Sequence, residues 1–256
     1  MESLVLEGVT KVFRHRPSLF NLVGRERRGQ TLALDRLSLQ ASSGEVLALL
    51  GPNGSGKTTL LKLVSTMLVP DAGRVLVNGF NTLTHAQDVR QMIGFAVATE
   101  RSFYPRLTAR ENLRFFAVLE DVAASGREAR IDSLLRSSGL EGAEDTLVMK
   151  FSTGMYQKLG LARALLKEPK VLLLDEPARS LSPEAALDFY ARLQQLRTTG
   201  TTILLATHNF DEANRVADRI AIIRHGRLAA IQNVNPHNAE ELRSLYFTAI
   251  GSAAAS

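Results

Sequence analysis

Residues 51–58 read Gly51-Pro52-Asn53-Gly54-Ser55-Gly56-Lys57-Thr58, which fits the pattern G-x-x-x-x-G-K-[S/T] at every fixed position. The apolar run Val46–Leu50 precedes this stretch and predicts a buried strand. The helical pattern Lys57–Leu68 follows it. Glycines allow a tight turn whose backbone N–H groups converge, and the N-terminus of the following helix also favours phosphate anions. The stretch therefore predicts a binding site for a nucleoside triphosphate.

Two side chains of this loop have expected roles of their own. Lys57 is placed to reach the β- and γ-phosphates, and the Thr58 hydroxyl is placed to ligate Mg²⁺. GTPases, small-molecule kinases, helicase motors and transporters all carry such a loop. The loop alone therefore leaves the reaction open.

A second motif ends another apolar run, Val171-Leu-Leu-Leu-Asp175-Glu176-Pro177. An acid at the carboxyl end of a strand faces the ligand crevice of an open α/β sheet. We expect Asp175 to hold Mg²⁺, directly or through water, and Glu176 to orient or deprotonate an attacking water. The alternative is an acid-rich helix N-terminus that begins at Pro177. The second carboxylate favours hydrolysis over transfer to another substrate.

His208 follows the next predicted strand, Thr201–Ala206. A lone histidine is more often a surface or packing residue than a functional one. The end of this strand lies at the same edge of the sheet as the acidic motif, where a ring N–H can reach the γ-phosphate. This placement favours a functional role for His208.

Composition excludes several other classes of protein. The 256 residues contain no cysteine, so disulfides and Cys-ligated zinc or iron–sulfur sites are excluded. No apolar run approaches the ~18 residues that span a bilayer, and the acidic start does not resemble a signal peptide. Any action on a membrane therefore requires a separate partner that crosses it. The net charge of +5 fits nucleic acid, an anionic membrane surface or nucleotide, although a solvated basic surface is favoured.

Strand-like runs alternate with helical patterns, which predicts an α/β fold with a mostly parallel sheet and helices on its faces. Strands are expected at Leu4–Val9, Ala33–Leu39, Val46–Leu50, Arg74–Val77, Ile93–Val97, Val171–Leu174 and Thr201–Ala206, with a hairpin over residues 220–231. Helices are expected at Lys57–Leu68, Thr108–Leu119, Arg127–Ser138, Met155–Leu166, Pro183–Arg197 and Asn238–Phe247. Thr108 and Glu111 resemble a capping box. The mainly helical middle segment predicts an inserted second lobe.

A third motif, Phe151-Ser152-Thr153-Gly154-Met155, lies shortly before the acidic strand and resembles the signature Leu-Ser-Gly-Gly-Gln. With the two other motifs, it makes nearly the whole chain resemble the nucleotide-binding domain of ABC transporters. The resemblance implies a P-loop NTPase core with an antiparallel β subdomain and an inserted helical lobe. It divides a single domain, 1–256, into a core at about 1–90 and 167–235, a lobe at about 91–166, and a C-terminal helix and tail at 236–256.

The resemblance implies a role for each motif residue. Phe13 is expected to stack on the adenine ring, and Gly51–Thr59, which includes Thr59, to form the Walker A loop. Ser152 and Gly154 are expected to contact the γ-phosphate that the opposite subunit binds. Asp175 matches the Walker B acid, Glu176 the catalytic base, and His208 the switch histidine, and residues 178–183 match the D-loop. The implied ligands are ATP and Mg²⁺, with Thr58 and Asp175 at the metal.

The resemblance also implies partners. Such domains pair head to tail, so that the signature of one subunit completes the phosphate loop of another. The expected partners are a second nucleotide-binding subunit, identical or similar, and a transmembrane permease, and no nucleic acid is expected. The expected location is the cytoplasmic face of the cell membrane, as a peripheral subunit. The signature variant, residues 100–108 and the basic segment Lys11–Arg28 resemble exporter subunits for polysaccharide, lipid-linked or drug efflux.

Two departures from the family pattern bear on catalysis. The glutamine that usually follows the strand Ile93–Val97 is absent, and either Thr99 or Glu100 takes its place. Ser182 replaces the usual aspartate of the D-loop. These changes motivate one alternative, a regulator that binds ATP but scarcely hydrolyses it.

A soluble ABC-type ATPase that acts on nucleic acid or ribosomes is the other alternative. Such proteins typically carry two nucleotide domains, or a long coiled coil between the two motifs. This chain has a single phosphate loop, and the gap from Thr58 to Phe151 is too short for a coiled-coil arm. The hypothesis of a transporter subunit is therefore preferred.

Overall fold

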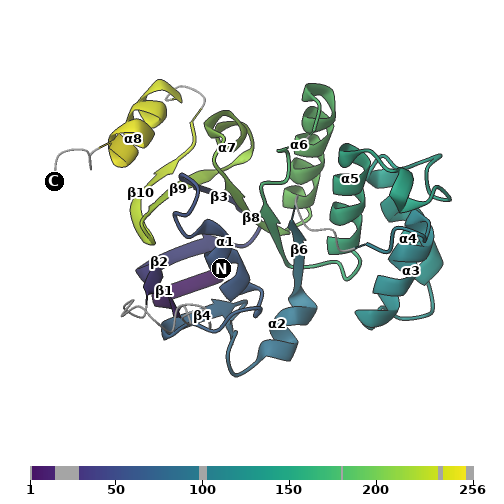
Figure 1. The fold of residues 1–256 in the computed structure, drawn as a ribbon, viewed down its shortest axis with the longest axis horizontal. Coiled ribbons are helices and arrows are strands. Elements are labelled where there is room, and N and C mark those ends of the chain that lie inside the picture. Colours follow the sequence, from purple (N-terminus) through teal and green to yellow (C-terminus); the bar gives the residue numbers. More distant parts are fainter. Residues whose placement is uncertain (1, 15–28, 98–102, 180, 236–238, 252–256) are drawn as a thin grey trace, which may run out of the picture.

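The computed structural model describes residues 2–14, 29–97, 103–179, 181–235 and 239–251. A six-stranded sheet in the order β10-β9-β3-β8-β7-β6 forms the centre of this part of the chain (Figure 1). Its strands are β3 (Val46–Leu50), β6 (Ile93–Val97), β7 (Val171–Asp175), β8 (Thr202–Thr207), β9 (Arg219–Arg224) and β10 (Arg227–Asn233). All neighbours pair in parallel except β9 and β10. The expected parallel sheet and terminal hairpin are confirmed.

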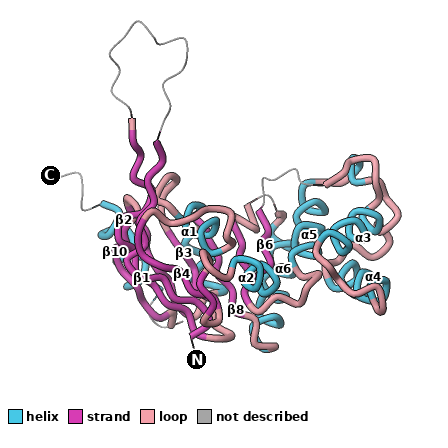
Figure 2. Tube along the Cα trace, turned by 90° about the horizontal axis from the view of Figure 1, so that it is seen from below, coloured by secondary structure: helices cyan, strands magenta, loops and turns pink. Residues whose placement is uncertain are grey.

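A second, antiparallel sheet has the order β2-β1-β4-β5. It consists of β1 (Glu2–Arg14), β2 (Gln30–Ser42), β4 (Ala72–Val77) and β5 (Phe80–Asn81). Figure 2 shows β1 and β2 extending side by side beyond the rest of this sheet. This sheet confirms the expected antiparallel β subdomain.

Helix α1 (Lys57–Val64) packs between the two sheets. Its buried Leu60 and Leu61 belong to one core cluster with side chains of β1, β2 and β4 and with one face of β3, β7 and β8. Side chains alternate between the faces of a strand. The opposite face of β3, β7 and β8 therefore packs elsewhere, on α6 (Pro183–Thr198), α7 (Phe210–Val216) and the lobe. Burial on both faces explains why these three strands read as continuous apolar runs.

The helical lobe contains α3 (Ala109–Leu119), α4 (Arg127–Ser137), the short 3₁₀ turn Val148–Lys150 and α5 (Thr153–Ala164). The capping box that opens α3 is confirmed, because Thr108 and Glu111 each accept a hydrogen bond from the other's backbone N–H. Buried leucines of the three helices share a core with the large sheet. The lobe lies beside the β6–β7 edge of that sheet, with α5 nearest to it (Figure 1).

Several sequence-based assignments differ from the structure. The sequence analysis began the helical lobe at about residue 91, which places β6 in the lobe. In the structure, β6 is hydrogen-bonded to β7 and so is a strand of the large sheet. α1 ends at Val64 rather than Leu68, because Thr66 has a φ of +65°, outside the helical region. The sequence analysis assigned no helix to α7 or to α2 (Ala86–Met92). The last helix, α8, spans Ala239–Gly251.

None of the helices in the described part of the chain is long and apolar enough to span a bilayer.

Candidate functional site

The loop between β3 and α1 requires glycine at two positions. Gly56 has a φ of +110°, and a Cβ there would lie 2.6 Å from the carbonyl oxygen of Ala33. A Cβ on Gly51 would lie 2.2 Å from the carbonyl oxygen of Ile223. Both distances are far below van der Waals contact. The loop is therefore wedged between the two sheets, and any side chain at these positions would displace it.

Lys57 begins α1 and points back into the loop. Its Nζ donates to the carbonyl oxygens of Gly51 at 2.7 Å and Pro52 at 3.0 Å. Burial lowers the pKa of Lys57, and the charges of Glu176 and Asp175 oppose that shift. Ser55 Oγ is buried in the same loop without a hydrogen-bond partner among the described residues. The loop thus holds a cation and an unused hydroxyl, which suits a phosphate.

Asp175 is the last residue of β7 and meets α1 across the site. Its Oδ2 accepts a hydrogen bond of 2.8 Å from Thr58 Oγ1. Burial raises the pKa of this carboxyl, and the Thr58 hydroxyl lowers it. Two oxygen ligands therefore converge from separate elements. This donor set fits Mg²⁺, which is usually bound by one or two carboxylates together with substrate phosphates.

Glu176 follows directly and lies against His208. His208 Nδ1 is 2.7 Å from Glu176 Oε2. Glu176 has a φ of +53°, in the left-handed region that non-glycine residues seldom adopt. Its backbone N–H donates to the carbonyl oxygen of Ala206 at 2.9 Å. This hydrogen bond to β8 holds the unusual backbone and brings the two functional side chains together.

A cavity of about 420 Å³ lies over the phosphate loop. Its lining includes Phe13, Asn53, Gly54, Ser55, Gly56, Lys57, Thr58, Thr59, Asp175 and Glu176. Exposed Arg179 also lines it, a residue that the sequence analysis did not single out. Phe13 comes from the antiparallel sheet and the acids from the parallel one. The structure therefore gathers most of the predicted site residues around one space.

Ser152 and Gly154 do not line this cavity. Ser152 caps α5, since its Oγ accepts a hydrogen bond of 3.2 Å from the Met155 N–H, and its side chain is exposed. A Cβ on Gly154 would lie 3.6 Å from Leu181 Cδ2 and meet no backbone. The predicted helix N-terminus is confirmed.

The sequence matches the family described as ABC transporter over residues 34–179. The chain belongs to the ABC transporter family. The daunorubicin resistance ATP-binding protein DrrA3 of Streptomyces coeruleorubidus is 40% identical over 208 residues, 81% of this chain and 66% of that protein. The Nod factor export ATP-binding protein I of Burkholderia lata is 40% identical over 205 residues, 80% of this chain and 67% of that protein. The match thus spans about two thirds of these longer relatives.

A solved structure shows the same fold. The chain resembles cbiO1 of Clostridium perfringens, part of the ABC transporter complex cbiONQ, with a TM-score of 0.78. The sequences are 25% identical, and the match covers 96% of this chain and 94% of that chain. The ABC cassette fold and the resemblance to exporter-type ATP-binding subunits are confirmed. The predicted class, an ABC ATPase, is confirmed at the level of the family.

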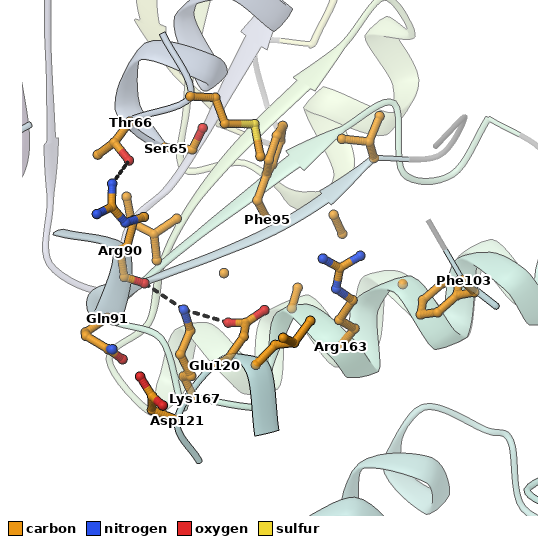
Figure 3. A pocket seen from close by; sticks show the side chains of 18 of the residues that line it. Ser65, Thr66, Arg90, Gln91, Phe95, Phe103, Glu120, Asp121, Arg163 and Lys167 are labelled. Atoms are coloured by element: carbon orange, nitrogen blue, oxygen red, sulfur yellow. Dashed lines mark hydrogen bonds and ion pairs between the residues drawn. The ribbon is translucent and has the colours of Figure 1, made fainter. Parts of the chain in front are cut away.

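This chain has a second cavity, of about 610 Å³, which is larger than the one over the phosphate loop and lies between the helical lobe and the large sheet (Figure 3). Lys167 connects the lobe with α2 beside this cavity. Its Nζ lies 2.6 Å from Glu120 Oε2 and donates to the Arg90 carbonyl oxygen at 2.7 Å. The guanidinium of Arg163 lies 3.7 Å from the centre of the Phe116 ring. We call this cavity the lobe groove.

Some family positions lie outside the described residues. They are Thr99 and Glu100, which replace the family glutamine, the segment 15–28 of the basic stretch, and residue 180 of the D-loop. Ser182 is described, and its Oγ accepts a hydrogen bond of 3.3 Å from the Ala185 N–H at the start of α6. The residue that replaces the D-loop aspartate therefore serves as a helix cap.

Proposed function

We propose that this chain is the ATP-hydrolysing motor subunit of an ABC exporter, which drives a separate transmembrane permease from the cytoplasmic face of the membrane. One observation carries the proposal. Lys57, Asp175 and Glu176 line one cavity, whereas Ser152 and Gly154 open a helix that does not line it. The signature is thus free to serve another subunit. Two copies in a head-to-tail pair would each complete the other's site.

In this proposal the loop binds the triphosphate of ATP and Phe13 stacks on the adenine. Lys57 exchanges its bonds to two loop carbonyls for charge-assisted bonds to the β- and γ-phosphates. Thr58 and Asp175 would hold Mg²⁺, and the ion would neutralise phosphate charge. Thr59 and Ser55 contribute further loop donors. The partner's Ser152 hydroxyl and helix N-terminus face the γ-phosphate from the other side.

Glu176 is the proposed general base. It takes a proton from a water molecule whose oxygen attacks the γ-phosphorus, while the bond to the β–γ bridging oxygen breaks and leaves ADP and phosphate. Contact with His208 Nδ1 orients the carboxylate and leaves the other ring nitrogen for the γ-phosphate. The side chain of Glu176 is 18% exposed and that of His208 is 49% exposed. The pair therefore sits at a surface that a second subunit would cover.

The lobe groove is the proposed contact site for the permease. It lies between the lobe, which carries the signature, and the sheet, which carries the acids. Met67 and Leu119 line it and are 59% and 62% exposed, so an apolar face of a cytoplasmic permease helix could pack there. Movement of the lobe relative to the sheet would then reach the partner. Export as the direction rests on the names of the relatives, drug resistance and Nod factor export.

A single substitution tests the proposal. Glu176→Gln keeps the shape of the side chain and removes the base. We expect it to abolish Mg²⁺-dependent ATP turnover and to produce an ATP-dependent dimer in size-exclusion chromatography. Turnover is measured on the chain purified with its membrane partner. Negligible turnover in that wild-type complex would instead favour the regulator, and recovery of ribosomes or DNA in place of a membrane protein would favour the soluble ATPase.

A further inference from the structure

Glu212 is a buried acid for which the proposed reaction gives no direct role. It lies in the first turn of α7, and 5% of the residue is exposed. Its Oε2 accepts a hydrogen bond of 2.5 Å from Thr207 Oγ1. Its Oε1 is buried and has no hydrogen-bond partner among the described residues. A buried carboxyl with a single hydrogen bond lowers the stability of the fold, which suggests that Glu212 has a functional role.

The bond to Thr207 connects Glu212 to the residue next to His208. Thr207 is the last residue of β8 and is fully buried. Its Oγ1 also accepts a hydrogen bond of 3.0 Å from the Asn209 N–H. The Asn209 side chain in turn caps α7, accepting from the Asp211 and Glu212 N–H groups at 2.9 and 3.2 Å. The residues on both sides of His208 are therefore fixed by one network that ends on Glu212.

His208 itself has no such burial. Its side chain is half exposed, and among the described residues its side-chain polar contact is the 2.7 Å approach of Nδ1 to Glu176 Oε2. The direction of the ring is thus set largely by the backbone on either side of it. A loss of the Thr207 bond would free that backbone and let the ring leave Glu176.

The surroundings of Glu212 favour its neutral form. Burial is the main cause that raises the pKa of this carboxyl, and the negative charge of Glu176 raises it further. The Thr207 hydroxyl and His208 act in the opposite direction. Tyr190 on α6 and Arg215 on α7 also face this region. A neutral acid still offers Thr207 a carbonyl oxygen, so glutamine should replace it with little loss.

We propose that Glu212 is a positioning residue for ATP hydrolysis, which acts through Thr207 to hold the His208 ring against the Glu176 carboxylate. This inference rests on the proposed function, in which Glu176 is the base. Glu212 does not touch the nucleotide in this account. Its effect is on the rate of hydrolysis and not on nucleotide binding.

The first test compares three variants of the full chain. Glu212→Ala should lower kcat on the order of 10- to 100-fold, the loss expected when a catalytic group is displaced by about 1 Å. The Kd for ATP should be unchanged. Glu212→Gln should keep most of the activity. Asp211→Ala is the matched control, since it removes an exposed acid from the adjacent position and should leave kcat unchanged.

A double-mutant cycle separates positioning from general loss of stability. If Glu212 acts through His208, then Glu212→Ala should have no further effect on kcat in a His208→Ala background. Equal losses of kcat in both backgrounds would overturn the proposal, as would full activity of Glu212→Ala. If Glu212→Ala does not fold, Thr207→Val and Thr207→Ser give the same comparison, because only the serine keeps the hydroxyl.

The imidazole of His208 provides a readout that needs no turnover. The chain has five histidines, so the NMR signal of His208 can be assigned with His208→Ala. The ring chemical shifts of His208 report its contact with Glu176, so they should change in Glu212→Ala and stay close to wild type in Glu212→Gln. Unchanged ring chemical shifts in Glu212→Ala would contradict the inference. A wild-type chain that hydrolyses no ATP with its membrane partner would instead contradict the proposed function, so the two failures are distinguishable.

Discussion

Replacing Thr58 by valine removes one hydroxyl from the proposed metal site while preserving the shape of the side chain. In the structure that hydroxyl donates to Asp175 Oδ2 at 2.8 Å, and 6% of Asp175 is exposed. Removing one partner of a buried, charged acceptor costs about 1–3 kcal/mol. Because Thr58 is itself exposed, water can partly replace it, and we expect about 1–2 kcal/mol. For a chain of this size that corresponds to a fall in Tm of ~2–8 °C.

The pH dependence of this loss has a definite sign. The Thr58 hydroxyl lowers the pKa of Asp175, so it stabilises the ionised form. In the Val variant the folded-state pKa of Asp175 rises further. The extra cost is therefore present at neutral pH and fades as the pH falls and Asp175 becomes protonated in both proteins. Denaturant unfolding of both proteins at neutral and acid pH measures this difference directly.

Nucleotide binding gives a second measure of the same substitution. Thr58→Val should reduce the gain in ATP affinity that Mg²⁺ provides, whereas Thr58→Ser should retain it. Thr59→Val is the control for the metal alone: it removes a loop hydroxyl that makes no bond to Asp175, so the gain in affinity from Mg²⁺ should remain even where ATP binding itself weakens. Equal stability of Thr58→Val and wild type at neutral pH, with an unchanged Mg²⁺ effect, would refute the assignment of Thr58 and Asp175 to one metal site.

Three further outcomes follow from the geometry. Gly94→Ala should lower the free energy of unfolding by at least about 1–3 kcal/mol, because the new Cβ would lie 2.1 Å from the Ala164 carbonyl oxygen. A thermal melt measures this loss. Gly160→Ala is the control, because a Cβ at Gly160 meets nothing within 4 Å. Lys57→Ala should raise the Kd for ATP by at least tenfold in a fluorescence titration, the loss of one charge-assisted contact. Burial raises the pKa of Glu212 in the folded chain. The free energy of unfolding of the wild type should therefore fall relative to that of Glu212→Gln as the pH rises above the pKa of this carboxyl in the unfolded chain. A difference in unfolding free energy that stays constant with pH would contradict the raised pKa.

The sequence was most informative where burial or motif spacing leaves few choices. The run Val46–Leu50 matches β3 at both ends, because a parallel strand buried on both faces is apolar throughout. The end of α1 was misplaced because Leu68 continues the helical spacing and packs on the core, although the chain has already left the helix at Thr66. Apolar spacing reports packing and not backbone angles.

α7 had a sequence signal that periodicity does not capture. Asn209 followed by Asp211 and Glu212 is a typical helix start, and Asn209 does cap α7. The helix is only seven residues long, too short for a clear apolar period. Cap chemistry, not the hydrophobic pattern, would have located it.

Site residues followed from motifs, but their contacts did not. Spacing predicts that Asp175 and Thr58 approach the same ligand, and the structure places their side chains 2.8 Å apart. The left-handed backbone of Glu176 depends on a hydrogen bond to β8, which no local pattern contains. The inward contacts of Lys57 and the cavity lining by Arg179 likewise arise from packing between distant segments.

The absence of cysteine allows the central claim, a site shared between two chains, to be tested by cross-linking. Asn53 in the phosphate loop and Thr153 in the signature are both exposed, and each can be replaced by cysteine in the Glu176→Gln background. A disulfide requires the two Cα atoms to lie within about 7 Å. We expect the double variant to form a covalent dimer under oxidation only when ATP and Mg²⁺ are present, while either single variant does not. A double variant that stays monomeric with ATP, although both thiols react with a small reagent, would contradict the head-to-tail site.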